Sequence, residues 1–297
     1  MMSNWILNGV TKKFEDTTAI NNISLEIEEN KIYGLIGRNG AGKTTLLKLL
    51  ANQLQPTEGI IQKGNVSIRG NDELTRSICL ARDSINIKGV AAFTVDKILK
   101  FASYIYPNWD NDYCEELINK FDLNPDKKYI KLSKGMHTVV GIVIGLASRA
   151  SLTMFDEPYI GLDPVFRELF YELLIADYEQ YKRTIIISSH LINEFENLFE
   201  RVLIIDRGRV LLNEELEEIR KKARLISGEK SVVEEILKGK NILYKQVIGK
   251  LANYTVLDDF TEKELYEYKN RNIKWSSLDL QRLFVNLSKG GHISEQQ

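Results

Sequence analysis

A glycine-rich run that ends in Lys-Thr is the strongest chemical signal in this sequence. Residues 37–44 read GRNGAGKT and lie between a short apolar run, residues 32–36, and an apolar segment of helical character, residues 44–50. In this context glycines let the backbone curl, so that successive N–H groups and the helix N-terminus form a cradle for an anion. Lys43 is expected to reach the β- and γ-phosphates of a nucleotide, and Thr44 to ligate Mg²⁺. The run therefore predicts a site for nucleotide phosphates.

Two adjacent carboxylates follow a second apolar run, and they could supply hydrolytic chemistry. Residues 152–155 read LTMF, and Asp156 and Glu157 come directly after them. Ligands of open α/β sheets bind at the C-terminal ends of the strands. Asp156 fits a magnesium site in which it acts through water, and Glu157 fits the orientation or deprotonation of an attacking water molecule. Two acids after a strand often form only a turn, so this interpretation depends on the phosphate loop upstream.

Composition and charge exclude several other classes of protein. The 297 residues are 43% hydrophobic and 27% charged, which predicts a globular chain with a sizeable core. The net charge of −1 leaves no broad basic surface for a phosphate backbone, so nucleic acid is not an expected partner. The N-terminus lacks the pattern of a targeting segment, and we expect a cytosolic protein. The longest apolar stretch, residues 139–147, is about half of the roughly 20 residues that a membrane span needs, so it predicts a buried core helix.

The elements that must position these side chains alternate between strands and helices. Apolar runs and alternating patterns predict strands over residues 5–10, 20–28, 32–36, 152–155, 184–188 and 202–205, and a strand pair around residues 60–68. Residues 84–150 differ, because two amphipathic segments, residues 95–105 and 113–121, predict an inserted helical subdomain. The two cysteines, Cys79 and Cys114, are too few and too far apart for a disulfide framework, so we expect reduced thiols.

The C-terminal part of the chain has a weaker pattern. Residues 214–224 predict a helix with opposite charges four residues apart, which is typical of a solvated face. Residues 277–287 predict a second helix with one apolar stripe, for which core packing is the default interpretation and a partner contact the alternative. Residues 288–297 are expected to be frayed.

Three further motifs stand in a fixed order around the two acids. They read LSKGM at residues 132–136, GLD at residues 161–163 and SSH at residues 188–190. With the phosphate loop and the acids, this ordered set resembles the nucleotide-binding subunit of ABC transporters over residues 3–210. The resemblance implies a P-loop NTPase of the α/β class, with a RecA-like core, an N-terminal antiparallel β subdomain and an inserted α-helical subdomain. It also implies an ATP-binding domain over residues 1–210 and a small C-terminal α/β extension over residues 211–297.

The resemblance also implies roles for individual residues. Lys43, Glu157 and His190 would be catalytic, with His190 contacting the γ-phosphate, and Thr44 and Asp156 would hold Mg²⁺. The signature residues Ser133 and Gly135 would close over ATP that is bound to a second subunit, and Asp163 would communicate across that dimer. Phe14 would stack on adenine, although simple hydrophobic packing is the alternative for this ring. The implied nucleotide contacts are Phe14, Gly37, Asn39, Gly40, Ala41, Gly42, Lys43, Thr44, Thr45, Ser133, Gly135 and Asp163.

The sequence departs from the family pattern at a few positions. Arg82 follows the strand predicted over residues 77–81, where the family carries a glutamine. A guanidinium group only donates hydrogen bonds, so Arg82 cannot accept one or ligate Mg²⁺. Lys134 and Met136 replace the usual glycine and glutamine of the signature loop, and Ile160 replaces a small residue. The catalytic set itself remains, which favours active hydrolysis.

These observations predict a subunit that binds and hydrolyses Mg-ATP to energise transport through a separate membrane-spanning partner. The resemblance implies an exporter, a second ATP-binding subunit and a cytoplasmic position on the inner face of the cell membrane. A soluble ABC ATPase of translation or DNA repair is the first alternative, and the single motif set without a heptad run argues against it. A sensor that uses ATP only to dimerise is the second alternative, and Arg82 supports it.

Overall fold

The computed structural model describes residues 3–82, 92–189 and 192–290, and it divides the chain into two compact units. The first unit comprises Met1–His190 with Ile205–Val210, and the second comprises Leu191–Ile204 with Leu211–Gln297. Residues 191–204 therefore group with the C-terminal part of the chain. The assignment of residues 1–210 to a single functional domain stays a prediction.

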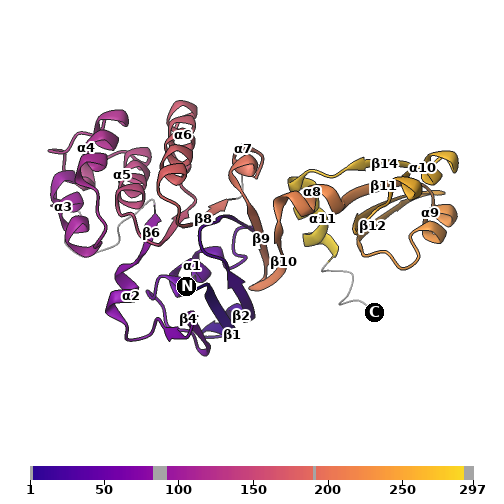
Figure 1. Ribbon diagram of the computed structural model, residues 1–297, viewed down its shortest axis with the longest axis horizontal. Coiled ribbons are helices and arrows are strands. Elements are labelled where there is room, and N and C mark those ends of the chain that lie inside the picture. Colours follow the sequence, from indigo (N-terminus) through magenta and orange to yellow (C-terminus); the bar gives the residue numbers. More distant parts are fainter. Residues whose placement is uncertain (1–2, 83–91, 190–191, 291–297) are drawn as a thin grey trace. The chain divides into compact units, whose positions relative to one another are not determined.

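An antiparallel sheet forms the N-terminal part of the first unit (Figure 1). Its strands run in the order β2-β1-β4-β5. Their bounds are Trp5–Phe14 for β1, Thr17–Ile27 for β2, Glu58–Lys63 for β4 and Val66–Ser67 for β5. Alternate residues of β2 are buried, as expected for a strand with one face on a core. The strands predicted over residues 5–10 and 20–28 are confirmed, and so is the strand pair predicted around residues 60–68.

A second sheet of six strands brings the ends of several strands to one edge. Its order is β10-β9-β3-β8-β7-β6. The bounds are Ile32–Ile36 for β3, Ile78–Arg82 for β6, Leu152–Asp156 for β7, Thr184–Ser189 for β8, Arg201–Asp206 for β9 and Arg209–Glu215 for β10. The pairings β3 with β8, β8 with β7 and β7 with β6 are parallel. Every residue of β3, β7 and β8 is buried, because strands inside a parallel sheet are covered on both faces.

The described parts of the first unit also contain the α-helices α1 to α6, and these confirm the predicted helical insertion. They are α1 (Lys43–Leu50), α2 (Asp72–Arg76), α3 (Val95–Ile105), α4 (Asn111–Lys120), α5 (Lys134–Ala147) and α6 (Pro164–Gln180). Figure 1 shows α3, α4 and α5 gathered together, with α6 beside them. The apolar residues 139–147 are the buried end of α5, as predicted. Across the described parts of the chain, no helix has the length and apolar character needed to span a membrane.

Two glycines let α5 lie directly against the central sheet. A Cβ atom on Gly141 would stand 2.5 Å from the carbonyl oxygen of Arg82, and one on Gly145 would stand 2.4 Å from the ring of Phe155. Real Cβ atoms do not approach other heavy atoms so closely.

Cys79 of β6 is buried and free, and burial raises the pKa of its thiol. Cys114 of α4 is also buried and free, so both cysteines are core thiols outside any disulfide, as expected.

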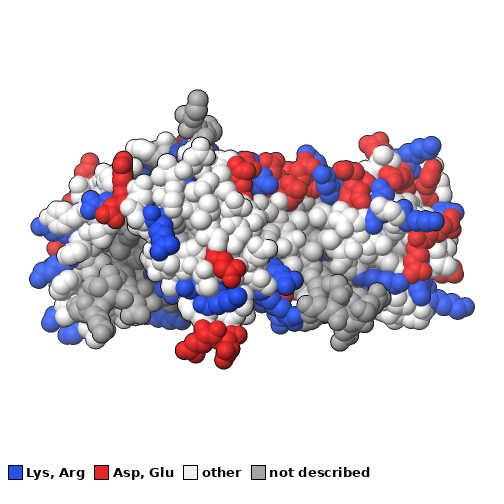
Figure 2. Space-filling view, turned by 90° about the horizontal axis from the view of Figure 1, so that it is seen from below, with Lys and Arg blue, Asp and Glu red and all other residues white. Residues whose placement is uncertain are grey.

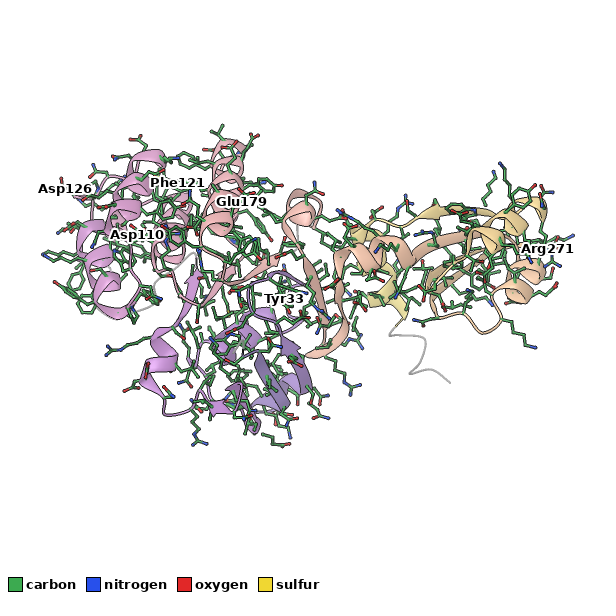
Figure 3. All side chains as sticks on the ribbon, in the orientation of Figure 1. Tyr33, Asp110, Phe121, Asp126, Glu179 and Arg271 are labelled. Atoms are coloured by element: carbon green, nitrogen blue, oxygen red, sulfur yellow. The ribbon has the colours of Figure 1, made fainter. Side chains whose placement is uncertain are left out.

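A buried ion cluster ties α6 to the segments that lead into β7 and β8. The Asp177 carboxylate pairs with the guanidinium groups of Arg149 and Arg183. Arg149 also reaches Asp110 at the start of α4, at 3.1 Å (Figure 3), and Arg183 donates to Thr153 of β7 at 3.2 Å. Burial raises the pKa of Asp177, and the two guanidinium groups oppose that shift. These contacts fix the positions from which β7 and β8 run toward the site.

The second unit is built on an antiparallel sheet in the order β12-β13-β11-β14. The strands are β11 (Ala223–Glu229), β12 (Ile242–Ile248), β13 (Leu251–Leu257) and β14 (Lys274–Ser277). The helices are α7 (Ile192–Phe195), α8 (Leu216–Lys222), α9 (Lys230–Ile236), α10 (Glu262–Asn270) and α11 (Leu280–Gly290). Its core contains Ile226, Val233, Tyr254, Val256 and Tyr268. This arrangement confirms the predicted α/β extension.

Two helix boundaries in this unit differ from the prediction. The helix predicted over residues 214–224 is shorter, because Glu215 ends β10 and Ala223 already begins β11. The helix predicted over residues 277–287 starts at Leu280, because Ser277 belongs to β14.

Helix α10 begins with a capping box, in which the backbone N–H of Thr261 and the ammonium group of Lys240 lower the pKa of Glu264 to about 2.

The close contact between α5 and β6 can be tested with Gly141→Ala. Inside a helix this substitution normally stabilises by about 1 kcal/mol. Here the new methyl group would press on the Arg82 carbonyl oxygen, so we expect the free energy of unfolding to fall by about 1–3 kcal/mol. Urea unfolding followed by circular dichroism measures the change. An unchanged or raised stability would contradict the packing.

Candidate functional site

The phosphate loop connects β3 to α1 and depends on glycine at defined positions. Gly40 and Gly42 have φ angles of 82° and 107°, in the left-handed region that favours glycine. A Cβ atom on Gly37 would stand 2.7 Å from the carbonyl oxygen of Ile205, and one on Gly42 would stand 2.6 Å from that of Ala19. No side chain caps the start of α1. The loop therefore leaves the first N–H groups of α1 directed at the space where an anion would be stabilised.

Lys43 links the phosphate loop to the predicted catalytic acid. Its side chain is only 6% exposed, and Nζ donates to the Gly37 carbonyl oxygen at 2.7 Å. The same Nζ lies 3.2 Å from Oε1 of Glu157. The ammonium group thus faces both the loop interior and the end of β7. A phosphate group entering this loop would meet one positive charge and one negative charge that already neutralise each other.

Asp156 joins three elements through its two carboxylate oxygens. Oδ2 accepts a hydrogen bond from Oγ1 of Thr44 at 2.8 Å, and Oδ1 accepts one from Oγ of Ser188 at 2.8 Å. The Ser188 oxygen in turn accepts from the backbone N–H of Glu157 at 2.9 Å. The hydroxyl and carboxylate oxygens of Thr44 and Asp156 are hard ligands of the kind that Mg²⁺ prefers, so this donor set fits the ion.

Glu157 adopts a backbone conformation that is uncommon for its residue type. Its φ angle is 54°, in the left-handed region, and its side chain is 15% exposed. Oε2 accepts a hydrogen bond from the hydroxyl group of Tyr159, while Oε1 faces Lys43. Such a conformation persists only where the surroundings hold it, and it is concentrated at functional sites. Here the bond from the Glu157 N–H to Ser188 supplies part of that restraint.

Two residues of this arrangement had no role in the sequence analysis. Ser188 enters the sequence analysis only as the last residue of the strand predicted over residues 184–188 and as the first residue of the SSH motif, and Tyr159 does not enter it. The polar residues at the end of an otherwise apolar strand were a usable signal for Ser188. Nothing in the local pattern marked Tyr159, because its contact with Glu157 arises from the turn that follows β7.

A cavity of about 410 Å³ opens over the phosphate loop. The loop and the first turn of α1 line it, through Arg38, Asn39, Gly40, Gly42, Lys43, Thr44 and Thr45. Ala19, Glu157 and Ile160 complete the lining. Gly37 and Ala41 lie behind this surface, where Ala41 is buried. Phe14 does not line the cavity, but its ring is 43% exposed at the end of β1, with Nζ of Lys12 5.1 Å from the ring centroid.

The signature residues lie elsewhere in the first unit and act as helix caps. Ser133 precedes α5 and accepts a hydrogen bond from the Met136 N–H at 3.2 Å, and Asp163 precedes α6 and accepts one from the Phe166 N–H at 2.9 Å. Gly135 touches the turn before α6, because a Cβ atom there would stand 2.4 Å from the Gly161 carbonyl oxygen. None of Ser133, Gly135 and Asp163 is among the residues that line the cavity over the phosphate loop.

The remaining predicted positions are Arg82 and His190. Arg82 ends β6 and is the register partner of Asp156 in the parallel pair β6 and β7. Its Nε lies 3.4 Å from Oδ2 of Asp156, which is the oxygen that also accepts from Thr44. Arg82 therefore stands beside the acid that was assigned to Mg²⁺. His190 lies outside the described residues.

Comparisons with known proteins point to one family. A sequence family described as ABC transporter matches residues 20–160. The ABC transporter ATP-binding protein YtrB of Bacillus subtilis is 28% identical and aligns with 72% of this chain and 73% of its own length. The lantibiotic transport ATP-binding protein SrtF of Streptococcus pyogenes is 32% identical, over 70% of this chain and 90% of its own length. A dimeric post-hydrolysis structure of the ATP-binding cassette MJ0796 with ADP and Pi matches with a TM-score of 0.61 at 23% identity, over 71% of this chain and 98% of that one.

The bond network at Asp156 makes a prediction about stability. Ser188→Ala removes a hydrogen bond to a carboxylate, so we expect the free energy of unfolding to fall by about 1.5–3 kcal/mol. Ser148→Ala is the matched control, because Ser148 is equally buried but bonds to uncharged groups, namely the Gly145 carbonyl oxygen, the Ala150 N–H and the Cys79 thiol. Its loss should cost about 0.5–1.5 kcal/mol. Urea unfolding measures both. A smaller loss for Ser188→Ala than for Ser148→Ala would contradict the assigned network.

Proposed function

This chain belongs to the ABC transporter family of ATP-binding proteins, and from that premise we propose that it hydrolyses Mg-ATP to drive transport through a separate membrane-spanning partner. The proposal rests on two contacts between the start of α1 and the end of β7. Lys43 lies beside Glu157, and Thr44 donates a hydrogen bond to Asp156. This arrangement supports a site in which Lys43 would pair with phosphate, the oxygens of Thr44 and Asp156 would hold Mg²⁺ and Glu157 would act as general base.

In the proposed mechanism, each of the site residues has a separate role in ATP hydrolysis. Lys43 pairs with the β- and γ-phosphate oxygens, and the N–H groups of the loop hold the same oxygens. Thr44 and Asp156 would hold Mg²⁺, which neutralises charge that develops on the phosphates. Glu157 orients the attacking water molecule and accepts its proton. Tyr159 fixes one carboxylate oxygen of Glu157, so the other remains directed at the phosphate loop.

A second subunit completes the proposed site. Ser133 and Gly135 do not line the cavity over their own phosphate loop, yet they begin α5, a helix of 14 residues. Its N-terminus suits the stabilisation of phosphate charge on another chain. We assign Asp163 to contact across this dimer, Phe14 to adenine stacking and His190 to the γ-phosphate. The dimeric cassette with ADP and Pi supports an assembly of this kind.

The proposal also includes a transport partner and a direction of transport. A relative named for lantibiotic transport supports a role in transport, and we propose export, with the chain on the inner face of the cell membrane. Figure 2 shows acidic and basic side chains interspersed on one face of the molecule, which does not favour nucleic acid as the partner. A sensor that binds ATP without hydrolysing it is the second candidate, because Arg82 stands beside the metal-binding acid.

Two substitutions separate ATP binding from hydrolysis. Lys43→Ala should lower kcat/KM for ATP by about 10²–10³-fold, because it removes the cation that pairs with the phosphates. Glu157→Gln should keep ATP bound within about twofold while kcat falls by about 10²-fold or more, since an amide cannot accept the proton. Phosphate release and binding of a fluorescent ATP analogue measure the two effects.

Lys48→Ala is the matched control for these experiments. Lys48 lies on α1, in its last turn, and does not line the cavity. This variant should bind and hydrolyse ATP like the wild type. Normal affinity and turnover in Lys43→Ala would refute the phosphate loop, and a normal rate in Glu157→Gln would refute the catalytic carboxylate. Tight ATP binding by the wild type with no phosphate release would favour the sensor.

The shared site can be tested by mixing two inactive variants. Lys43→Ala and Ser133→Arg chains should partly restore turnover together, because a mixed dimer contains one intact composite site. Turnover per wild-type chain should also rise with protein concentration. A monomeric wild type that hydrolyses ATP at a concentration-independent rate would contradict the shared site. An inactive wild type without rescue would instead indicate a different partner ATPase.

A further inference from the structure

Arg82 and Asp156 are held next to each other by the register of two parallel strands. They are direct partners in the pairing of β6 and β7, and Nε of Arg82 lies 3.4 Å from Oδ2 of Asp156. The Asp156 side chain is only 6% exposed and that of Arg82 is 27% exposed. The two charges are therefore shielded from much of the solvent, where their attraction is stronger than at a free surface.

Oδ2 of Asp156 also accepts a hydrogen bond from Thr44, and it is a proposed ligand of the divalent cation. Together with the Thr44 hydroxyl, this oxygen offers the cation its ligands. A guanidinium group stays positively charged at all ordinary pH values. A cation that approaches Oδ2 must therefore either displace the guanidinium group or bind against its charge.

The backbone of Arg82 cannot withdraw to relieve this competition. A Cβ atom on Gly141 of α5 would stand 2.5 Å from the Arg82 carbonyl oxygen and 3.3 Å from its amide nitrogen, so the helix lies directly against this residue. Among the residues that the structure describes, the buried Nε atom has no hydrogen-bond partner of good geometry, although it is close to Asp156. The contact is thus mainly a charge attraction, which a stronger cation can replace.

We propose that Arg82 competes with the divalent cation for Asp156 and so raises the Mg²⁺ concentration that nucleotide binding requires. This inference rests on the proposed ATP site and identifies a residue that sets its metal dependence. In the absence of Mg²⁺ the guanidinium group balances the charge of Asp156. When Mg²⁺ is bound, Arg82 is released from Oδ2 and its charge is free to face phosphate oxygens.

The test measures the metal dependence of nucleotide binding rather than turnover. Binding of a fluorescent, non-hydrolysable ATP analogue is followed at increasing Mg²⁺ concentration for the wild type and Arg82→Gln. Paramagnetic resonance of Mn²⁺ with the same analogue gives an independent reading of metal affinity. We expect Arg82→Gln to lower the half-saturating Mg²⁺ concentration by about tenfold, the size of effect that one partly buried charge can exert.

Three further variants separate charge from other effects. Arg82→Lys keeps the charge and should stay within about threefold of the wild type. Arg82→Met removes the charge while keeping an aliphatic chain, and it should follow Arg82→Gln, so a folding defect in one neutral variant does not decide the result. Arg76→Gln removes an exposed arginine on α2 and should leave the metal dependence unchanged.

The outcomes distinguish this inference from the proposed function. Equal Mg²⁺ dependence in the wild type and both neutral variants would overturn the role of Arg82 while leaving the ATP site intact. A shift in Arg82→Lys as large as in Arg82→Gln would also overturn it, because the charge would then not be the cause. Failure of the wild type to bind the analogue at any Mg²⁺ concentration would overturn the proposed function itself.

Discussion

The buried carboxylate of Asp156 is the interaction on which the site depends. It is nearly excluded from solvent, so each of its oxygens must find a partner inside the protein. Thr44 satisfies one oxygen from the start of α1, and Ser188 satisfies the other from the end of β8. The phosphate loop and two strands of the sheet are thereby fixed to one side chain. A single buried charge thus sets the distances at which Lys43 and Glu157 meet.

The pairing of Lys43 with Glu157 is the second consequence of this framework. Both groups are mostly buried, and each would be costly to leave uncompensated. The hydroxyl of Tyr159 and the Ser188 bond to the Glu157 N–H hold the carboxylate despite its left-handed backbone. Under the proposed function, phosphate oxygens would compete with Glu157 for Lys43, and the carboxylate of Glu157 would then be available to accept a proton from water. Substrate binding would thereby be linked to the availability of the general base.

The sequence allowed the phosphate loop, the two acids and most of the first unit to be predicted, because these features are local. Glycine spacing, an apolar strand and a following Lys-Thr can be recognised without tertiary contacts. The partnership of Arg82 with Asp156 could not be predicted, since it arises from the register between strands more than 70 positions apart along the chain. The α/β character of the second unit was predicted, but its individual strands were not located. The residues of β14 are all exposed and most of those of β12 are, so neither strand shows the alternation of a half-buried strand.

Helix α5 connects the signature residues to the metal-binding edge. Ser133 caps its first turn, Gly135 contacts the turn at Gly161, and Gly141 contacts the backbone of Arg82. A continuous helix of 14 residues transmits displacement along its axis because each turn is bonded to the next. Under the proposed function, a subunit that docks at Ser133 would press on a helix that packs directly against Arg82. Oδ2 of Asp156 lies close to Arg82 and accepts a hydrogen bond from Thr44. Docking at the signature loop and cation binding at the phosphate loop would then act on the same carboxylate, and any coupling between them would be equal in both directions.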